Sequence, residues 1–352
     1  MEIRDLTIEN LEIPFRQEFQ HASSKRVVTE SVLVTARTHD GLTGLGEGCP
    51  RDYVTGETLT SVHEFFNRYR PELLKVDQVE ELISWTNFHR EEIDCNPAAY
   101  CAMESALLNI FALSTHQSIE NILSVPDLAG DFHYSAVLGA RSPTQFNEQL
   151  RQYSALCFKD YKIKLFGDLQ TDRTNLVAFM DVIGNDVRVR FDANNIWASA
   201  NDAVEFLRLL DVVAFALEEP LSPGDFDGFR YIGETLNTQI ILDESFLKLA
   251  DINSISNDPE RWIINIRISK MGGLIRSLEI AQRAKELGIG IVIGAQVGET
   301  SILTRAALPL ANAYRDILIA QEGAFGTYLL ERDVVDPPIM FGHGGILSSD
   351  RL

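Results

Sequence analysis

The sequence predicts an α/β protein in which a (β/α)8 TIM-type barrel follows an N-terminal α+β capping domain. The chain has 352 residues, of which 45% are hydrophobic, so it can form a sizeable buried core. Its first part changes from alternating apolar residues to apolar residues at helical spacing. Beyond residue 125, short apolar runs alternate with longer amphipathic stretches, which is the pattern of parallel strands joined by helices.

The N-terminal part begins with apolar residues in alternation, as expected of β-strands. This pattern covers residues 3–13 and returns at 31–35, before a glycine-rich segment. From residue 58 to about 123 the apolar residues recur at helical spacing. Chain-breaking residues at 125–130 indicate a boundary. We therefore expect strands followed by helices in a capping domain of residues 1–125.

Eight short apolar runs in the rest of the chain have the spacing of barrel strands. The stretches between them are long enough for the helices that parallel strands require. The barrel then covers residues 126–327, and residues 328–352 form a tail that packs back on the cap. We expect helices at 172–183, 200–210, 274–287 and 300–313, and strands at 134–138, 161–165, 187–191, 213–217, 240–242, 263–266, 289–293 and 317–320.

Composition excludes several kinds of partner. The chain has 31 Lys and Arg residues against 51 Asp and Glu, a net charge of −20, which repels nucleic acid and anionic lipid. It contains no apolar run long enough for a membrane span and no signal peptide. Cys49, Cys95, Cys101 and Cys157 match neither a disulfide framework nor a metal-binding pair. We expect buried free thiols in a cytoplasmic protein.

Four polar side chains stand where four successive predicted strands end. Lys164, Asp192, Glu218 and Asp243 are separated by 28, 26 and 25 residues, about one strand-helix unit each. Because the carboxyl ends of barrel strands share one face, we expect these side chains to converge there. Three converging carboxylates repel one another unless a cation neutralises them. Their oxygen donors predict Mg²⁺ at Asp192, Glu218 and Asp243, with Mn²⁺ as the alternative.

Two lysines occupy the first of these four strands. Lys162 and Lys164 are two residues apart, so they point to the same face of a strand. Burial near a cation would lower the pKa of a lysine toward that of a usable general base. A Lys-x-Lys pair on an exposed edge would have no such role, but the neighbouring carboxylates favour the catalytic interpretation.

The motifs at these strand ends resemble those of the enolase superfamily, in its muconate-lactonizing-enzyme-like branch of the mandelate racemase/muconate lactonizing enzyme family. The resemblance covers nearly the whole chain and implies a Mg²⁺-dependent isomerase or lyase. It also implies that Lys164 removes a proton next to a carboxylate, while Lys162 and the metal stabilise the enediolate. The motifs are Lys162-Ile-Lys164, Asp192-Ala-Asn194, Glu218-Glu219-Pro220, Asp243-Glu244-Ser245 and Lys270-Met-Gly-Gly273.

The resemblance adds further candidate residues around the site. Asn194, Glu244 and Glu299 match family positions that orient ligands or the lysines. Tyr53 and Thr55 lie in a segment similar to the family's loop over the substrate. The expected partner is a small-molecule carboxylate, and we expect the chain to form a homo-oligomer.

The sequence departs from the family pattern at two places. Arg267 stands where the family's epimerases have a second lysine, although Lys270 follows three residues later. An arginine is a poor base but can hold an anion through two parallel hydrogen bonds. At the end of the last strand, only Glu322 stands where dipeptide epimerases have an Asp-x-Asp.

The first departure favours one-base chemistry, either cycloisomerisation or β-elimination, with Arg267 as an electrostatic clamp. The second leaves a free α-amino group without a clamp of two carboxylates, which makes a dipeptide substrate less expected. Two alternatives remain open. One is a racemase or epimerase of an amino-acid derivative or dipeptide that uses an unusual second group. The other is a catalytically silent barrel that binds a metal.

Overall fold

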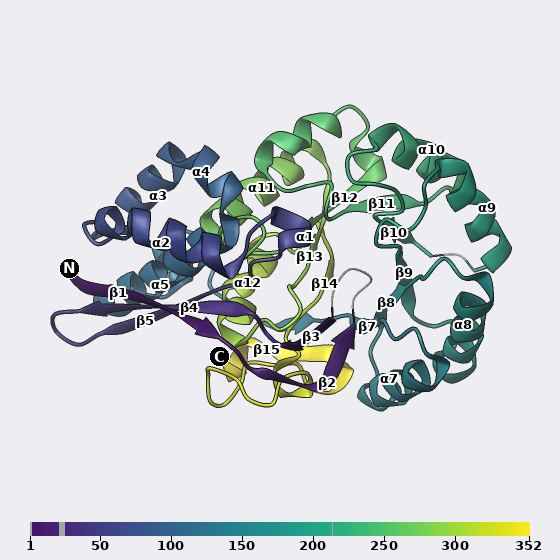
Figure 1. Cartoon of the computed structure of the whole chain (residues 1–352), viewed down its shortest axis with the longest axis horizontal. Coiled ribbons are helices and arrows are strands. Elements are labelled where there is room, and N and C mark those ends of the chain that lie inside the picture. The colour runs from purple at the N-terminus through teal and green to yellow at the C-terminus, as the bar shows by residue number, and fades with distance from the viewer. Residues whose placement is uncertain (1, 21–24, 213) are drawn as a thin grey trace.

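The computed structural model describes residues 2–20, 25–212 and 214–352, and its main body is a curled parallel sheet surrounded by helices (Figure 1). In these residues eight parallel strands lie in the order β14-β13-β12-β11-β10-β9-β8-β7. The two ends of the sheet meet where the amide of Ser135 donates to the carbonyl of Gln321 at 2.7 Å. The strands are β7 (Ala136–Leu138), β8 (Asp160–Lys164), β9 (Arg188–Asp192), β10 (Ala216–Glu218), β11 (Gln239–Leu242), β12 (Trp262–Ile266), β13 (Gly290–Ile293) and β14 (Leu318–Gln321).

All eight predicted barrel strands are confirmed, with bounds that differ by a few residues. Val213, at the start of the fourth predicted strand, lies outside the described residues. The strands are apolar because they are covered on both faces, with residues such as Ile241 and Ile263 fully buried. The barrel helices are α7 (Pro143–Leu156), α8 (Leu169–Ile183), α9 (Ala200–Leu210), α10 (Phe226–Leu236), α11 (Leu274–Leu287) and α12 (Ser301–Ala313).

One connection differs from a regular strand-helix repeat. Between β11 and β12, the structure has the 3-10 helices η1 (Leu249–Ser254) and η2 (Pro259–Arg261) and no α-helix among the described residues. This segment is rich in Ser, Asn and Asp, whose side chains compete for backbone hydrogen bonds, and Pro259 cannot continue a helix. The expectation of a full crossover helix at every step is therefore wrong here.

The N-terminal residues form the predicted strands followed by helices. Strand β5 packs directly on helix α5. The two backbones are so close that a Cβ at Gly46 would lie 2.0 Å from the carbonyl oxygen of Ala102, so this position requires glycine. Gly44 and Gly48 approach α5 in the same way, which explains the glycine-rich segment. The sheet strands are β1 (Ile3–Leu11), β4 (Ser31–Thr38) and β5 (Thr43–Gly48); a separate hairpin has β2 (Pro14–Gln20) and β3 (Lys25–Val28); the helices are α1 (Asp52–Thr55), α2 (Leu59–Leu73), α3 (Val79–Phe88), α4 (Arg90–Cys95), α5 (Pro97–Thr115) and α6 (Ile119–Ile122).

Two buried carboxyl groups of the N-terminal part bind the first turns of barrel helices. Glu104 on α5 accepts hydrogen bonds from the amides of Leu274 at 2.6 Å and Ile275 at 3.1 Å, at the start of α11. Glu47 on β5 accepts from the amide and hydroxyl of Thr300 before α12. Helix starts have unpaired amide groups, so these carboxyl groups join the two parts of the chain.

The C-terminal tail contacts both parts of the molecule. Strand β15 (Ile346–Ser348) pairs with β6 (Asp131–His133), just before the barrel. The amide of Glu331 donates to the carbonyl of Pro14, at the start of β2. The domain boundaries at 125 and 327 stay a prediction. The remaining 3-10 helices are η3 (Gly326–Tyr328), η4 (His343–Gly345) and η5 (Ser349–Arg351).

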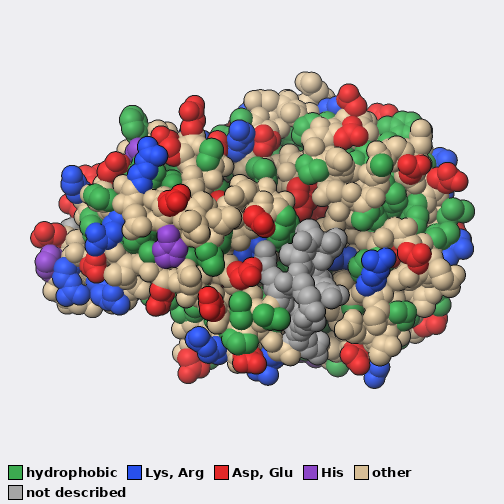
Figure 2. All heavy atoms as spheres, viewed as in Figure 1, with side chains coloured by type: hydrophobic (Ala, Val, Ile, Leu, Met, Phe, Trp, Pro, Cys, Tyr) green, Lys and Arg blue, Asp and Glu red, His purple; other side chains and the backbone are tan. Residues whose placement is uncertain are grey.

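The surface carries both signs of charge, and the cysteines differ in their burial. Acidic and basic side chains are mixed across the face shown in Figure 2. Within the described segments, no helix is both long and apolar enough to cross a membrane. All four cysteines are free, and Cys49 and Cys101 are buried as expected. The expectation of burial is wrong for Cys95 and Cys157, which are exposed because they end α4 and follow α7 on the surface.

Candidate active site

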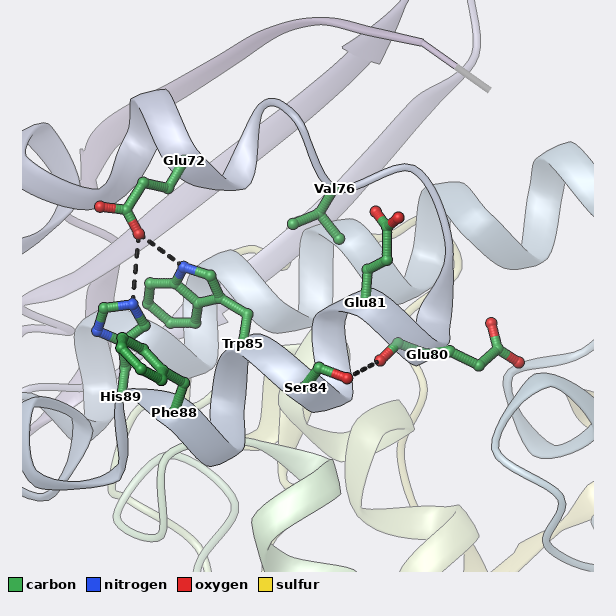
Figure 3. Close-up of a pocket in the computed structure, with 8 residues that line it drawn as sticks. All are labelled: Glu72, Val76, Glu80, Glu81, Ser84, Trp85, Phe88 and His89. Atoms are coloured by element: carbon green, nitrogen blue, oxygen red, sulfur yellow. Dashed lines mark hydrogen bonds and ion pairs between the residues drawn. The ribbon is translucent and has the colours of Figure 1, made fainter.

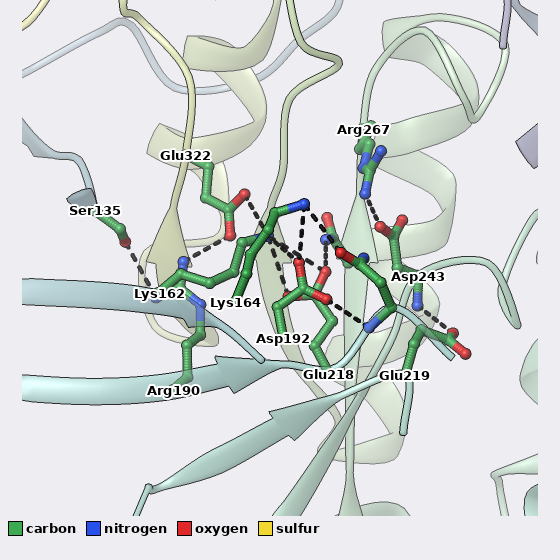
Figure 4. Close-up of polar contacts among 12 residues, drawn as sticks. Ser135, Lys162, Lys164, Arg190, Asp192, Glu218, Glu219, Asp243, Arg267 and Glu322 are labelled. Carbon is green, nitrogen blue, oxygen red and sulfur yellow. Dashed lines mark hydrogen bonds and ion pairs between the residues drawn. The ribbon is translucent and has the colours of Figure 1, made fainter. Parts of the chain in front are cut away.

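The strand register places the predicted residues side by side at the carboxyl ends of the strands (Figure 4). Lys164 on β8 is the register partner of Asp192 on β9, and Asp192 is the partner of Glu218 on β10. Asp243 follows β11 two positions after Ile241, which is the partner of Glu218. The structure therefore brings these four side chains together, as the sequence predicts.

Lys162 lies at the centre of the acidic group. Its Nζ atom is 3.3 Å from Glu218 Oε2, 3.5 Å from Asp192 Oδ2 and 2.9 Å from Glu322 Oε2. Burial alone would lower the pKa of Lys162, but these three carboxylates raise it above its ordinary value. The side chain is 4% exposed. Lys162 is therefore a fixed positive charge at the site.

Lys164 has a different environment although it is only two residues away. Its Nζ atom donates to Asn194 Oδ1 at 3.0 Å and is 3.7 Å from Asp192 Oδ2. Burial lowers the pKa of Lys164, and the charge of Lys162 acts in the same direction. Its side chain is 16% exposed and so remains accessible to solvent. A lysine with these properties is suited to be a general base.

A buried ion pair between Arg190 and Glu322 lies next to Lys162. Sequence reasoning missed this pair. Arg190 donates to Glu322 Oε1 at 2.7 Å and to the hydroxyl of Ser135 at 3.2 Å, and it also pairs with Asp160. Burial would raise the pKa of Glu322, but Lys162 and Arg190 lower it to about 2. Arg190 could have been found from its position two residues before Asp192, which places it on the same face of β9.

Asp243 is bound by two cations. Lys270 Nζ donates to Asp243 Oδ1 at 2.7 Å, to the Asp243 carbonyl at 2.8 Å and to the Asn265 carbonyl at 2.9 Å. Burial and the charge of Arg267 lower the pKa of Lys270 to about 7. Arg267 pairs with Asp243 Oδ2. Lys270 is 1% exposed, so it supports Asp243 from within the protein interior.

Arg267 links the ends of β12 and β13. Besides its ion pair with Asp243, it donates to Gln296 Oε1 at 3.0 Å. Its side chain is 13% exposed, and its Nε atom has no hydrogen-bond partner among the described residues. Sequence reasoning named Arg267 but missed Gln296, because a single glutamine after a strand carries no distinctive pattern.

The remaining acidic candidates lie on the loops that follow the barrel strands. Glu299 accepts from the amide of Gln296 at 2.5 Å, and burial raises its pKa to about 8. Glu244 is half-buried, and burial and the charge of Glu219 raise its pKa to about 8. Glu219, missed as a separate candidate, holds the loop after β11 by accepting from the amide of Asp243 at 2.7 Å.

Tyr53 and Thr55, which the resemblance places in a loop over the substrate, lie in the short helix α1. Tyr53 and Thr55 are both half-buried. The hydroxyl of Thr55 donates to Glu57 Oε2 at 3.0 Å, and Glu57 in turn accepts from the amides of Ala98 and Ala99 at the start of α5. Thr55 thus helps to hold this segment on the capping helices.

The three predicted metal ligands fit a hard cation in their chemistry. Each is a carboxylate at a strand end, and Mg²⁺ prefers such oxygen donors. Cationic side chains contact all three, with Lys162 beside Asp192 and Glu218, and Arg267 on Asp243. Among the described residues, no three His, Cys, Asp or Glu side chains are already arranged as a metal cage.

A separate groove of about 480 Å³ lies on the capping helices (Figure 3). Trp85, Phe88 and His89 form its aromatic side, and Glu72 accepts from the indole of Trp85 at 2.9 Å. None of the predicted site residues lines this groove. It is therefore distinct from the acidic centre at the strand ends.

Comparison with known proteins gives consistent matches over the chain. A profile of the enolase C-terminal domain-like family matches residues 145–351. A hydrophobic dipeptide epimerase from Enterococcus faecalis is 26% identical over 333 residues, covering 93% of this chain and 92% of that protein. An L-Lys-D/L-Arg epimerase from Methylococcus capsulatus is 27% identical over 364 residues, covering 100% of this chain and 98% of that protein.

A solved structure agrees with these matches. The dipeptide epimerase from Enterococcus faecalis, complexed with Mg and the dipeptide L-Leu-L-Tyr, superposes with a TM-score of 0.86 at 25% identity. The superposition covers 99% of this chain and 97% of that chain.

Proposed function

Because this chain belongs to the enolase C-terminal domain-like family, we propose that it is a Mg²⁺-dependent racemase or epimerase of an amino-acid derivative. In this proposal Lys164 removes the proton next to a substrate carboxylate on one face, and a second proton donor on the opposite face delivers a proton to the same carbon, which inverts it. The observation that carries the proposal is Lys164, a partly exposed lysine of lowered pKa that lies beside three acidic strand ends.

The side chains have distinct roles in this reaction. Lys164 takes the proton through Nζ, and Asn194 orients that amine through its 3.0 Å contact. Lys162 stays protonated and stabilises the negative charge that develops on the substrate. Asp192, Glu218 and Asp243 would hold Mg²⁺. The metal supplies Lewis-acid stabilisation of the enediolate when bound.

This proposal changes the preference drawn from the sequence. Cycloisomerisation or β-elimination was expected first, because Arg267 replaces a second lysine. The curated relatives are named as epimerases, which favours the racemase or epimerase alternative. One-base chemistry stays the second candidate, because the structure shows Arg267 engaged with Asp243 and Gln296 and it cannot easily lose a proton.

The experiment is proton exchange in D₂O, followed by NMR, with Mg²⁺ and a panel of dipeptides and N-acylated amino acids. We expect deuterium at the α-carbon and formation of the second stereoisomer. Exchange in only one stereoisomer would favour the one-base reaction. No exchange with any member of the panel would contradict the proposal.

Two lysine variants at opposite ends of β8 test the role of Lys164. Lys164→Ala should abolish exchange and leave Mg²⁺ affinity nearly unchanged. Lys159→Ala is the matched control, because Lys159 stands just before the same strand, at its opposite end, with a 77% exposed side chain. Exchange by Lys164→Ala at the wild-type rate would assign the base to another group.

A further inference from the structure

We propose that Arg267 and the divalent cation compete for Asp243, and that the displaced guanidinium binds a second anionic group of the substrate. This inference rests on the proposed function and names a substrate class for the same site. The preferred substrate would be a carboxylate that carries a further negative charge away from the reacting carbon.

The contacts of Asp243 give the first step. Its carboxylate is 1% exposed, with Lys270 on Oδ1 and Arg267 on Oδ2. Each oxygen therefore faces a positive group, but Oδ2 accepts no hydrogen bond among the described residues and is held by the ion pair alone. A divalent cation bound to Oδ2 cannot share this oxygen with a guanidinium. Two positive groups on one oxygen atom would be in direct contact and would repel one another.

The two cations differ in how firmly they are held. Lys270 is almost fully buried and donates to three acceptors within 2.9 Å, two of which are backbone carbonyls. Arg267 is 13% exposed and has one side-chain acceptor besides Asp243 among the described residues, and its Nε atom donates to none of them. Arg267 is therefore the partner that a metal displaces, while Lys270 stays in place.

The displaced guanidinium then needs a new anion, because an unpaired charge in a partly buried site is costly. Glu322, at the end of β14, is held by Lys162 and Arg190 at 2.9 and 2.7 Å, so it is not available to bind a substrate ammonium group. The cation that the metal releases is Arg267, and its planar fork matches a carboxylate through two parallel hydrogen bonds. These features favour a dianionic substrate over a cationic one.

The first test measures Mg²⁺ binding by calorimetry and does not depend on activity. Arg267→Met and Arg267→Gln should bind Mg²⁺ at least tenfold more tightly than the wild type, because the competitor for Asp243 is gone. Arg305→Met is the matched control, since Arg305 pairs with Glu120 at 2.8 Å outside the site. Equal Mg²⁺ affinities in the wild type and both Arg267 variants would overturn the inference.

The second test measures the substrate group with two probes of equal chain length. In the presence of saturating Mg²⁺, the wild type should bind succinate at least tenfold more tightly than butyrate. Arg267→Met should lose this preference. A preference that is unchanged in the variant would show that another group holds the second carboxylate, and the absence of a preference in the wild type would show that Arg267 turns elsewhere, for instance to Glu299. Either result would overturn this part of the inference.

Failure of the proposed function would give different results. Asp192→Asn, Glu218→Gln and Asp243→Asn would then leave Mg²⁺ affinity unchanged, and the wild type would exchange no α-proton. Failure of the inference alone would leave metal binding and exchange intact and would remove only the effects of the Arg267 variants.

Discussion

The hydrogen bonds between Glu104 and the start of α11 predict strong coupling between Glu104 and Gly273. Gly273 has φ +99°, and a Cβ there would lie 2.1 Å from Glu104 Oε2. An alanine at this position would therefore strain the backbone and displace the carboxyl group. Displacement breaks the two hydrogen bonds from Leu274 and Ile275.

The magnitude follows from these two effects. The backbone conformation costs about 1 to 3 kcal/mol for a residue with a Cβ. The two hydrogen bonds contribute about 1 kcal/mol each. Gly273→Ala should thus lower the free energy of unfolding by about 4 kcal/mol. In a Glu104→Ala background the same substitution should cost only the backbone part, so the coupling energy should be about 2 kcal/mol.

Urea unfolding of the four proteins of this double-mutant cycle measures the coupling. Additive effects, within about 0.5 kcal/mol, would refute the reasoning, because they would mean that Gly273 is needed only for its own backbone. Gly288→Ala serves as the control. Gly288 has φ +76° but a Cβ there would meet no atom within 4 Å, so only the backbone part should be lost.

Three further predictions concern charge. Glu322→Gln should lower the free energy of unfolding by about 3 to 5 kcal/mol, because it leaves Lys162 and Arg190 with less compensation, whereas Glu331→Gln on the surface should have little effect in the same thermal unfolding assay. Burial raises the pKa of Glu104 from 4.5 to about 8, so the folded protein keeps a proton that the unfolded chain releases. The stability of the wild type should therefore fall as the pH rises between these values, by at most about 1.4 kcal/mol per pH unit from this group, and Glu104→Gln should lack that part of the slope in urea unfolding at pH 5 and 8. Removal of divalent cations with EDTA should abolish α-proton exchange, and added Mg²⁺ should restore it; persistent exchange in EDTA would exclude the metal from the reaction.

The sequence was most informative where a simple period governs the structure. All eight barrel strands could be predicted, because a strand buried on both faces requires a short apolar run. The positions of Lys164, Asp192, Glu218 and Asp243 at successive strand ends likewise followed from the length of one strand-helix unit.

Contacts between distant segments were not accessible in the same way. Glu322 pairs with Arg190, 132 residues earlier, and no local pattern relates these positions. Gly273, the second glycine of the Lys270-Met-Gly-Gly273 motif, is required because Glu104, on another part of the chain, leaves no room for a Cβ. A helix was expected between β11 and β12 because the regular strand-helix repeat predicts one, but this segment has weak helical character and forms only 3-10 helices.

The carboxyl groups of Glu47 and Glu104 have a consequence for protein engineering. They provide acceptors for the first turns of α12 and α11, so part of the barrel's secondary structure is completed by residues that precede the barrel in the chain. A shortened protein that begins after residue 125 would leave both helices without these acceptors, and a chimera with a foreign capping segment would need carboxyl side chains at both positions. Changes confined to α1 around Tyr53 would leave both helix starts intact, because neither Glu47 nor Glu104 lies in that helix.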